Sequence, residues 1–299
     1  MAPRGNDEVA GAVLAVHGGA GGFRSVPEPR LARAREGLAA SLEAGLSVLG
    51  REGSAIDAVV AAVRVLEDHE ELNAGRGAVL NAEGEVELDA AVADGATGRV
   101  GAVGAVAGVR NPVDLAHAVL RERSSVLIAG PAASDLAGRL GLAMEPPDYF
   151  VTERRRRERT GPLGTVGAVA RDARGNLAAA TSTGGRTGKA PGRVGDSPVP
   201  GAGTWADNAT CAVSATGDGE AFLLAAFAHE VDARVRLLGQ SLAGACGAAL
   251  AAVERKDGAG GCIALSPDGR LVMPFTSPGM LRGWADEGGP VRISVFPED

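Results

Sequence analysis

A polar stretch in the middle of the chain, residues 145–164, constrains the fold more than any other feature of the sequence. It contains three prolines, two glycines and the run Arg154–Arg157, with few apolar residues. This composition predicts an exposed linker, in which the arginines form a solvated loop. A mid-chain linker usually marks a domain boundary. Here a strand pattern starts immediately afterwards, with Thr165 as its first residue, which indicates something other than a boundary.

The half before the linker combines short strands with amphipathic helices. An apolar strand at 12–16 runs into a glycine-rich loop at 17–22, and leucines at helical spacing over 31–49 predict a helix. A second helix is expected to begin at Ser54, where Ser54 and Asp57 form a capping-box signal. Further strands are expected at about 86–90 and 100–108, and helices near 112–122 and 131–140.

The half after the linker opens with a β-hairpin signal, in which the strands 165–172 and 176–183 flank a turn at 173–175. A strand at 211–216, a helix near 233–253 and a closing hairpin of 262–266 with 271–275 follow. Two runs of strands with helices before and after them favour a layered α+β fold over strict βαβ alternation.

Composition narrows the classes of function. Aromatic residues make up 3% of the 299 residues, so the core must be built mostly from Ala, Val and Leu, which suits thin, smooth layers. The net charge of −7 argues against nucleic acid or an anionic membrane as a principal partner. Three cysteines without CxxC spacing, and no apparent secretory signal or membrane span, predict reduced thiols in a cytoplasmic protein.

Several motifs resemble known sites and fail on inspection. Residues 185–190 resemble the end of a P-loop but have Ala190 where a metal-binding hydroxyl is required, and residues 201–206 match a dinucleotide pattern without a preceding strand. There is no GxSxG elbow, and His69 and His229 lack the second histidine of a zinc motif. The four histidines are scattered singly, so none is expected to form a conventional triad.

The segment that carries chemistry begins at Gly164-Thr165. A threonine at a strand start is common and means little alone. However, GTVGAVARDARGNLAAATSTGG (164–185), GRVGDSPVPGAG (192–203) and SATGDGE (214–220) stand in order after HGGAGG (17–22) and LNAGRGAVLNAEGEVELDA (72–90). Together they resemble the plant-type, threonine-dependent asparaginase and isoaspartyl peptidase family of N-terminal nucleophile hydrolases, over about residues 12–220.

The resemblance implies a four-layer αββα sandwich formed by residues 1–299 as one domain. It also implies self-cleavage between Gly164 and Thr165, which gives interleaved subunits 1–164 and 165–299 that assemble as (αβ)2. A freed Thr165 would join a hydroxyl nucleophile to its own α-amine, whose pKa of about 7.7–8 suits a base near neutrality. No histidine is needed for this chemistry.

Family positions assign roles to further residues. Thr183 would orient the nucleophile, while Asn73 and Thr216 would stabilise the oxyanion. Arg193 would bind the substrate carboxylate and Asp196 the ammonium. The alternative is that these two residues form an ordinary surface ion pair without a role in binding. Gly217 and Gly219 would let the substrate amine approach the backbone, and Gly18 and Gly19 would pack behind the nucleophile.

The implied mechanism needs no catalytic metal or cofactor. The family's cation-binding loop matches residues 66–76, where backbone carbonyls would hold a structural sodium or potassium ion. Carbonyl sites leave no side-chain signature, so the sequence neither proves nor excludes the ion. The expected carbonyl donors are those of Leu66, Glu67, His69, Leu72, Ala74 and Arg76.

The expected substrates are small molecules, L-asparagine and β-aspartyl dipeptides, which share one zwitterionic head. Arg193 and Asp196 would bind this shared head, so they do not indicate which of the two substrates the protein prefers. A glycosylasparaginase-like hydrolase is an alternative, although such enzymes generally have an acidic residue where Gly164 stands, and taspase-like proteases usually carry a longer insert. A catalytically silent, uncleaved amino-acid-binding homologue is a third possibility, against which the joint presence of the site residues argues.

Overall fold

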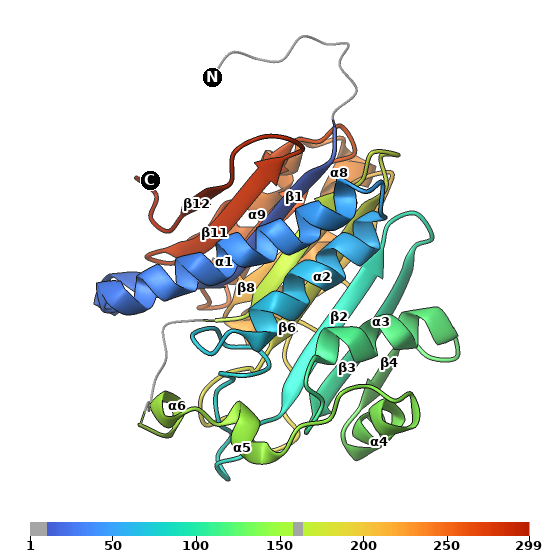
Figure 1. Cartoon of the computed structure of the whole chain (residues 1–299). Helices are drawn as coiled ribbons and strands as arrows, with labels where there is room; N and C mark the ends of the chain where they lie inside the picture. Colours follow the sequence, from blue (N-terminus) through green and yellow to red (C-terminus); the bar gives the residue numbers. More distant parts are fainter. Residues whose placement is uncertain (1–10, 158–163, 299) are drawn as a thin grey trace.

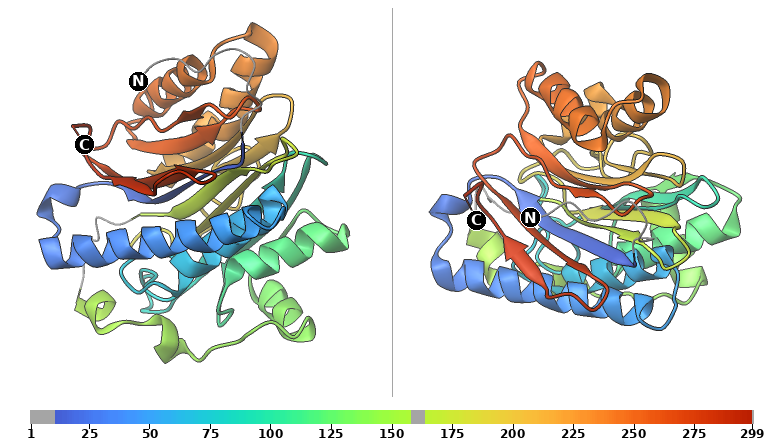
Figure 2. Two further views of the ribbon diagram at one scale, coloured as in Figure 1. Left: turned by 45° about the horizontal axis from the view of Figure 1, so that its top comes forward. Right: turned by 90° about the horizontal axis from the view of Figure 1, so that it is seen from above.

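Two β-sheets stack face to face between two layers of helices (Figures 1 and 2). A computed structural model of the intact chain describes residues 11–157 and 164–298. Separate clusters of buried side chains fill the space between the first helices and the larger sheet, between the two sheets, and between the smaller sheet and the later helices. The expected four-layer αββα sandwich of the α+β class is therefore confirmed.

The larger sheet combines strands from both halves of the sequence. Its order is β12-β11-β1-β5-β6-β2-β3-β4, and the neighbours are antiparallel except for β3 and β4. The strand that follows the mid-chain stretch, β5, lies in the centre of this sheet, so the stretch does not separate two domains. The strands are β1 (Val13–Ala20), β2 (Leu88–Asp94), β3 (Arg99–Val106), β4 (Leu127–Ala129), β5 (Val166–Arg171), β6 (Leu177–Thr183), β11 (Met280–Asp286) and β12 (Arg292–Ser294).

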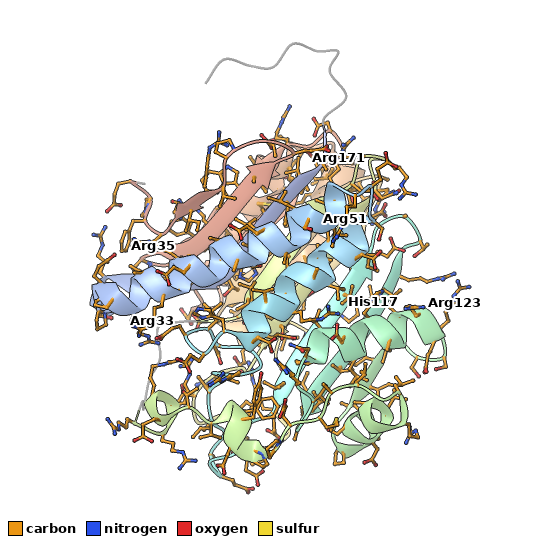
Figure 3. The ribbon with its side chains drawn as sticks, viewed as in Figure 1. Arg33, Arg35, Arg51, His117, Arg123 and Arg171 are labelled. Carbon is orange, nitrogen blue, oxygen red and sulfur yellow. The ribbon has the colours of Figure 1, made fainter. Side chains whose placement is uncertain are left out.

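Helices α1 (Glu28–Leu49), α2 (Ala55–Asp68) and α3 (Pro112–Glu122) cover the outer face of this sheet (Figure 1). The helix start expected at Ser54 is confirmed, because its hydroxyl oxygen caps α2 by accepting from the Asp57 amide at 3.2 Å. Short elements η1 (Phe23–Ser25) and α4 (Pro131–Arg139) complete this side. The outer side of α1 is polar: Arg33 pairs with Glu71 at 2.5 Å and Arg35 with Glu28 at 2.7 Å (Figure 3).

The smaller sheet has the order β10-β9-β8-β7 and belongs entirely to the second half of the chain. Its strands are β7 (Thr204–Asp207), β8 (Cys211–Gly217), β9 (Gly260–Leu265) and β10 (Leu271–Val272). Its outer helices are α7 (Gly219–Ala225), α8 (Phe227–Leu238) and α9 (Leu242–Glu254). The single helix expected near 233–253 is wrong: Gly239, at φ +62°, ends α8, and Ser241 caps α9.

Small side chains let the two sheets approach closely. Ala15, Val169, Ala179, Ala212 and Ile263 are among the fully buried residues between them. Gly167 marks the tightest approach, because a Cβ at this position would overlap the Ser214 hydroxyl. The low aromatic content noted in the sequence therefore has a direct structural use.

The mid-chain stretch differs from the exposed linker expected at 145–164. It contains the short helices α5 (Pro147–Phe150) and α6 (Glu153–Arg157), with Phe150 and Arg155 buried. The solvated loop expected for the arginine run holds only for Arg156 and Arg157, which are exposed. Arg155 Nε donates to the Gly77 carbonyl at 2.5 Å and Arg154 to that of Glu70 at 2.5 Å. The two guanidinium groups thus satisfy backbone carbonyls of the loop after α2. Sequence periodicity does not predict such contacts. Residues 158–163 of the expected linker lie outside the described residues.

Across residues 11–157 and 164–298, no helix combines the length and apolar character needed to cross a membrane.

Candidate active site

Thr165 lies directly before the central strand β5 and is buried. Its hydroxyl donates to Thr183 Oγ1 at 3.1 Å, and the Gly185 amide donates to the same oxygen at 2.9 Å. The pairing of Val166 with Ser182 in adjacent strands brings positions 165 and 183 together. The local contact between the two hydroxyls is thus a consequence of strand register.

The side chains at the end of β6 alternate between the two faces of the sheet. Thr183 contacts Thr165, and Thr181 contacts Ser214 of the smaller sheet at 2.7 Å, so both face the space between the sheets. Ser182 lies on the opposite face, beside the buried carboxyl of Glu67 in α2. Burial raises the pKa of Glu67 well above its usual value.

His17 holds the backbone of Thr165 from the neighbouring strand β1. Its Nδ1 lies 3.0 Å from the Thr165 carbonyl oxygen and its Nε2 lies 2.9 Å from Ser214 Oγ. Burial lowers the pKa of His17 to about 3, so the ring is neutral near pH 7. A carbonyl only accepts, so Nδ1 carries the proton and Nε2 accepts from Ser214.

Sequence reasoning missed this role, because His17 is 148 residues from Thr165. The signal that could have found it is the glycine at 167, opposite His17 in the β1–β5 pairing. A Cβ on Gly167 would lie 2.6 Å from His17 Nε2, so only glycine leaves room for the imidazole there.

Gly164 packs against Thr216 and against the glycine-rich segment 17–22, whose residues up to Ala20 belong to β1 and not to the expected loop. Gly19, at φ +110°, lies so close that a Cβ on it would overlap the Gly164 amide nitrogen. Thr216 Oγ1 lies 3.2 Å from the point that a Gly164 Cβ would occupy, and it accepts from the Ala20 amide at 3.2 Å. A Cβ on Gly18 would instead meet Leu38 and Leu281, and its expected place behind the nucleophile stays a prediction.

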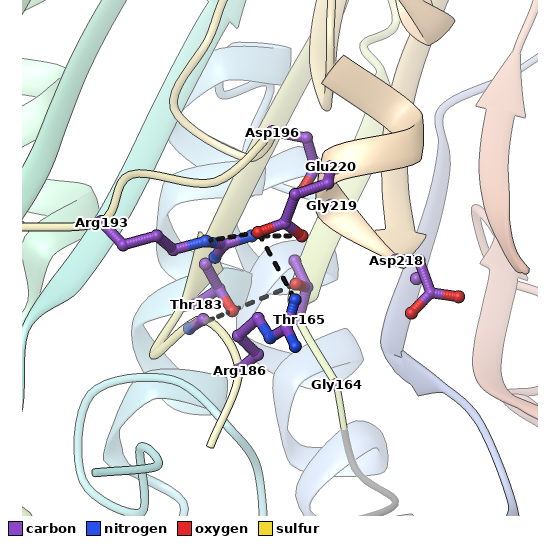
Figure 4. Close-up of a pocket in the computed structure, with 11 residues that line it drawn as sticks. Gly164, Thr165, Thr183, Arg186, Arg193, Asp196, Asp218, Gly219 and Glu220 are labelled. Atoms are coloured by element: carbon purple, nitrogen blue, oxygen red, sulfur yellow. Dashed lines mark hydrogen bonds and ion pairs between the residues drawn. The ribbon is translucent and has the colours of Figure 1, made fainter. Parts of the chain in front are cut away.

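A cavity of about 220 Å³ opens over Thr165 (Figure 4). It brings together six of the residues predicted for catalysis and substrate binding, and adds others that the sequence did not single out for substrate contact. The lining residues are Gly164, Thr165, Thr183, Gly185, Arg186, Arg193, Asp196, Gly217, Asp218, Gly219 and Glu220.

Arg193 and Asp196 meet at Gly219. Arg193 Nη2 and Asp196 Oδ1 lie 2.9 and 2.7 Å from the point that a Gly219 Cβ would occupy, so any side chain there would intrude between them. Asp196 is 4% exposed, and its Oδ2 has no hydrogen-bond partner among the described residues. Burial raises the pKa of Asp196 to about 7. The nearby Arg193 guanidinium lowers the pKa of Asp196 less than burial raises it, and among the described residues no cation is hydrogen-bonded to Oδ2.

Glu220 is a charged residue of the cavity that sequence reasoning missed. Its carboxylate accepts from Arg193 Nε at 3.1 Å and lies 3.0 Å from Arg193 Nη2, and it lies 3.7 Å from Arg186 Nη1 (Figure 4). The motif SATGDGE contains this glutamate, but only the position of α7 aims it at the arginine of a different loop.

Two carboxylates, the half-buried Glu87 beside β2 and the buried Asp89 within it, hold the loop that carries Arg193 and Asp196. Glu87 accepts from the Gly192 amide at 2.8 Å, and Asp89 from the Gly195 amide at 3.0 Å. Lys189 donates to the Glu87 carbonyl at 2.8 Å. Burial raises the pKa of Asp89 and lowers that of Lys189. Glu87 and Asp89 fall within the motif at 72–90, and Lys189 within residues 185–190, but none of the three was predicted as a site residue.

Asn73 does not line the cavity. Its amide donates to the Gly185 carbonyl at 2.7 Å, and its oxygen accepts from the Val79 amide at 2.9 Å. In the intact chain it therefore supports the turn whose Gly185 amide reaches Thr183. Its expected role as an oxyanion donor stays a prediction.

The segment at 66–76 spans the end of α2 and the loop after it, and several of its carbonyls accept hydrogen bonds within the segment. The carbonyls of Leu66, Glu67 and His69 accept from the amides of residues 69, 76 and 72, at 3.3, 2.7 and 3.1 Å. Each carbonyl keeps a second lone pair, and hard oxygen donors of this kind suit an alkali cation. Among the described side chains, no cluster of His, Cys, Asp and Glu is suited to a metal, so a cation here would rely on backbone oxygens.

Comparisons with known proteins agree across both halves of the chain. A family model described as Asparaginase matches residues 10–160 and 157–294. An isoaspartyl peptidase of Salmonella typhimurium is 41% identical over 96% of this chain and 99% of that protein. An isoaspartyl peptidase/L-asparaginase of Homo sapiens is 38% identical over 96% and 97% of the two chains. A plant-type L-asparaginase of Pyrobaculum calidifontis is 41% identical over 92% and 97%.

Proposed function

The chain belongs to the asparaginase family, and from this premise we propose that it hydrolyses the side-chain amide of L-asparagine and the isopeptide bond of β-aspartyl dipeptides. The observation that carries the proposal is the cavity over Thr165, in which a hydroxyl nucleophile lies beside a carboxylate and a guanidinium. Its volume of about 220 Å³ is below the roughly 300–1,000 Å³ of sites for drug-sized ligands. This size suits a single amino-acid head.

The enzyme first cleaves itself. The Thr165 hydroxyl attacks the carbonyl carbon of Gly164, an ester forms, and the Gly164–Thr165 C–N bond breaks as the nitrogen gains a proton. Water then hydrolyses the ester to a Gly164 carboxylate and restores the hydroxyl. The contacts of Thr165 with Thr183 and His17, and of Gly164 with Thr216, support this proposal because they fix both sides of the bond.

The freed α-amine of Thr165 then serves as the base of the second reaction. With a pKa of about 7.7–8, it accepts the hydroxyl proton while the oxygen attacks the substrate's side-chain carbonyl carbon. The resulting tetrahedral intermediate breaks its C–N bond and expels ammonia or an amino acid, whose nitrogen takes the proton from the α-amine. Water then hydrolyses the aspartyl ester that remains to aspartate and restores the Thr165 hydroxyl. The Thr216 hydroxyl would donate to the oxyanion, a contribution worth on the order of 10²–10³ in rate.

The substrate head would bind between two charges. The Arg193 guanidinium would hold the α-carboxylate through paired hydrogen bonds, and the ammonium would donate to Asp196 Oδ2, which has no protein partner among the described residues. An ammonium at this distance favours the ionised carboxylate and so lowers the pKa of Asp196 again. The bare Cα of Gly219 leaves the room that both contacts need.

One experiment tests the proposal directly. Intact mass and denaturing electrophoresis of purified protein should give two fragments that meet at Gly164 and Thr165, while Thr165→Ala stays whole. Ammonia release from L-asparagine and aspartate release from β-aspartyl dipeptides then measure hydrolysis. A wild-type chain that remains uncut after prolonged incubation and releases neither product would support the silent homologue instead.

Three further parts of the proposal concern assembly, ion and location. Two processed chains would pair as (αβ)2, which the mass from analytical ultracentrifugation would test. The carbonyls of the loop at 66–76 would hold sodium or potassium, which would stiffen the segment that carries Asn73. A cytoplasmic location is consistent with Cys211, Cys246 and Cys262, which are all free, buried thiols.

A further inference from the structure

Arg186 is a charged residue of the cavity that neither proposed reaction uses. It follows Gly185 on the turn after β6 and lines the same cavity as Thr165. Its side chain is 69% exposed, and Nη1 lies 3.7 Å from Glu220 Oε1. Among the described residues, this is the one charged partner within ion-pair distance of its guanidinium.

The contact between Arg186 and Glu220 is weak. Glu220 already holds Arg193 at 3.0 and 3.1 Å, whereas 3.7 Å is too long for a hydrogen bond. Exposed ion pairs of this kind contribute little. Arg186 can therefore exchange Glu220 for another carboxylate at small cost.

The charges of the two substrate classes differ by one. L-Asparagine brings an ammonium and a carboxylate, for which Asp196 and Arg193 are the proposed partners. A β-aspartyl dipeptide brings a third charge, the free α-carboxylate of the residue that leaves. The remaining charged side chain of the cavity is Asp218, which accepts from the Ala259 amide at 2.8 Å. As a carboxylate, it cannot bind this third charge. Among the residues that line the cavity, Arg186 is therefore the cation to which no group of the substrate has been assigned.

The position of Arg186 agrees with this third charge. In Figure 4 it lies on the side of Thr165 away from Asp196. The bond to be cut lies at Thr165, between the head and the leaving residue. A head bound at Arg193 and Asp196 therefore directs the leaving residue away from Asp196, toward Arg186.

We propose that Arg186 binds the free α-carboxylate of the leaving residue, and so makes β-aspartyl dipeptides better substrates than L-asparagine. The proposal rests on the function proposed above and names the substrate class that the same site prefers. A charge-assisted hydrogen bond at a partly exposed site corresponds to about 10-fold to 100-fold in kcat/KM.

The test compares Arg186→Gln with the wild type on L-asparagine, β-aspartyl-leucine and β-aspartyl-leucinamide, which lacks the free carboxylate. We expect kcat/KM for the dipeptide to fall about 10-fold to 100-fold, with L-asparagine and the amide changed less than about twofold. Arg174→Gln is the matched control. Arg174 lies in the turn between β5 and β6, where it is exposed and donates to the Glu52 carbonyl. It should match the wild type on all three substrates.

Equal losses on all three substrates, or on dipeptide and amide alike, would overturn the proposal in favour of a structural role. A second test uses the wild type alone and so does not depend on whether a variant folds. Its kcat/KM should be about tenfold or more higher for the dipeptide than for the dipeptide amide, and equal values would overturn the proposal. If the wild type neither cleaves itself nor hydrolyses any of the three compounds, the proposed function fails instead, which is a different outcome.

Discussion

Gly19 and Gly164 lie backbone against backbone, so close that a Cβ on Gly19 would overlap the amide nitrogen of Gly164. The end of β1 thus packs against the residue whose carbonyl the Thr165 hydroxyl is proposed to attack. Thr216 Oγ1 approaches the same glycine from the smaller sheet. Gly164 is therefore positioned by two segments that are distant in the sequence.

Gly19→Ala should slow self-cleavage by at least about 100-fold, since the added methyl displaces Gly164 and the φ of +110° is unfavourable for alanine. Denaturing electrophoresis over time would measure the uncut fraction. Gly22→Ala is the control, because a Cβ there meets nothing within 4 Å and its φ is −83°. Cleavage of Gly19→Ala at the wild-type rate would refute this packing argument.

Thr216→Val should lower kcat by about 10²–10³, because it removes one oxyanion donor and keeps the shape. It should also cost about 1–3 kcal/mol of unfolding free energy, because the Ala20 amide loses its acceptor. Single-turnover assays and the rate of self-cleavage would both report the loss. Thr97→Val, in an exposed turn where Thr97 bonds to Asp94, should behave as the wild type. An unchanged kcat in Thr216→Val would remove this residue from the oxyanion site.

His17→Leu should cost about 2–5 kcal/mol of unfolding free energy at pH 7, because the Thr165 carbonyl and the Ser214 hydroxyl lose their buried partner. The pKa of His17 is depressed in the folded state, from 6.5 to about 3. The unfolded chain therefore binds the proton first, and the contribution of His17 is present above pH 6.5 and lost as the pH falls.

Urea unfolding at pH 7 and pH 5 measures this dependence. The difference in stability between wild type and His17→Leu should shrink by about 2 kcal/mol at the lower pH, at 1.36 kcal/mol per pH unit. A difference that stays constant between the two pH values would show that His17 titrates normally.

Asp196→Asn should abolish measurable binding of L-asparagine and raise stability at pH 8 by about 1–2 kcal/mol, a trade of the kind seen at strained sites. The pKa of Asp196 is raised from 3.8 to about 7 in the empty site. Stability linked to this group is therefore fully present below pH 3.8 and lost as the pH rises through 7, and asparagine removes that loss.

The same shift predicts the pH dependence of binding. Substrate ammonium needs the ionised carboxylate, so KM for L-asparagine should rise up to about tenfold per pH unit as the pH falls below 7. Steady-state kinetics from pH 5 to pH 8 would show it. A KM that is flat over this range would mean that Asp196 is already ionised in the empty site.

Local features of the fold were predictable because their causes are local. The alternation of β6 follows from a two-residue period, which places Thr181 and Thr183 on one face and Ser182 on the other. The cap at Ser54 follows from a hydroxyl three residues before an acidic side chain. The helix break at Gly239 was missed, since an apolar stretch on both sides hides a single αL glycine.

The sequence by itself determined the identity of the chemistry: motifs in order predicted Thr165 as the nucleophile, Thr183 beside it, and Arg193 and Asp196 in one loop. Only the tertiary structure decided which groups meet these residues from elsewhere. The strand order β1-β5-β6 sets His17 against the Thr165 backbone, and the position of α7 aims Glu220 at Arg193. The same holds for Asn73, whose amide is satisfied by a turn more than 100 residues away at Gly185. Periodicity encodes which face of a strand is buried, but contacts across sheets and loops depend on how the layers pack.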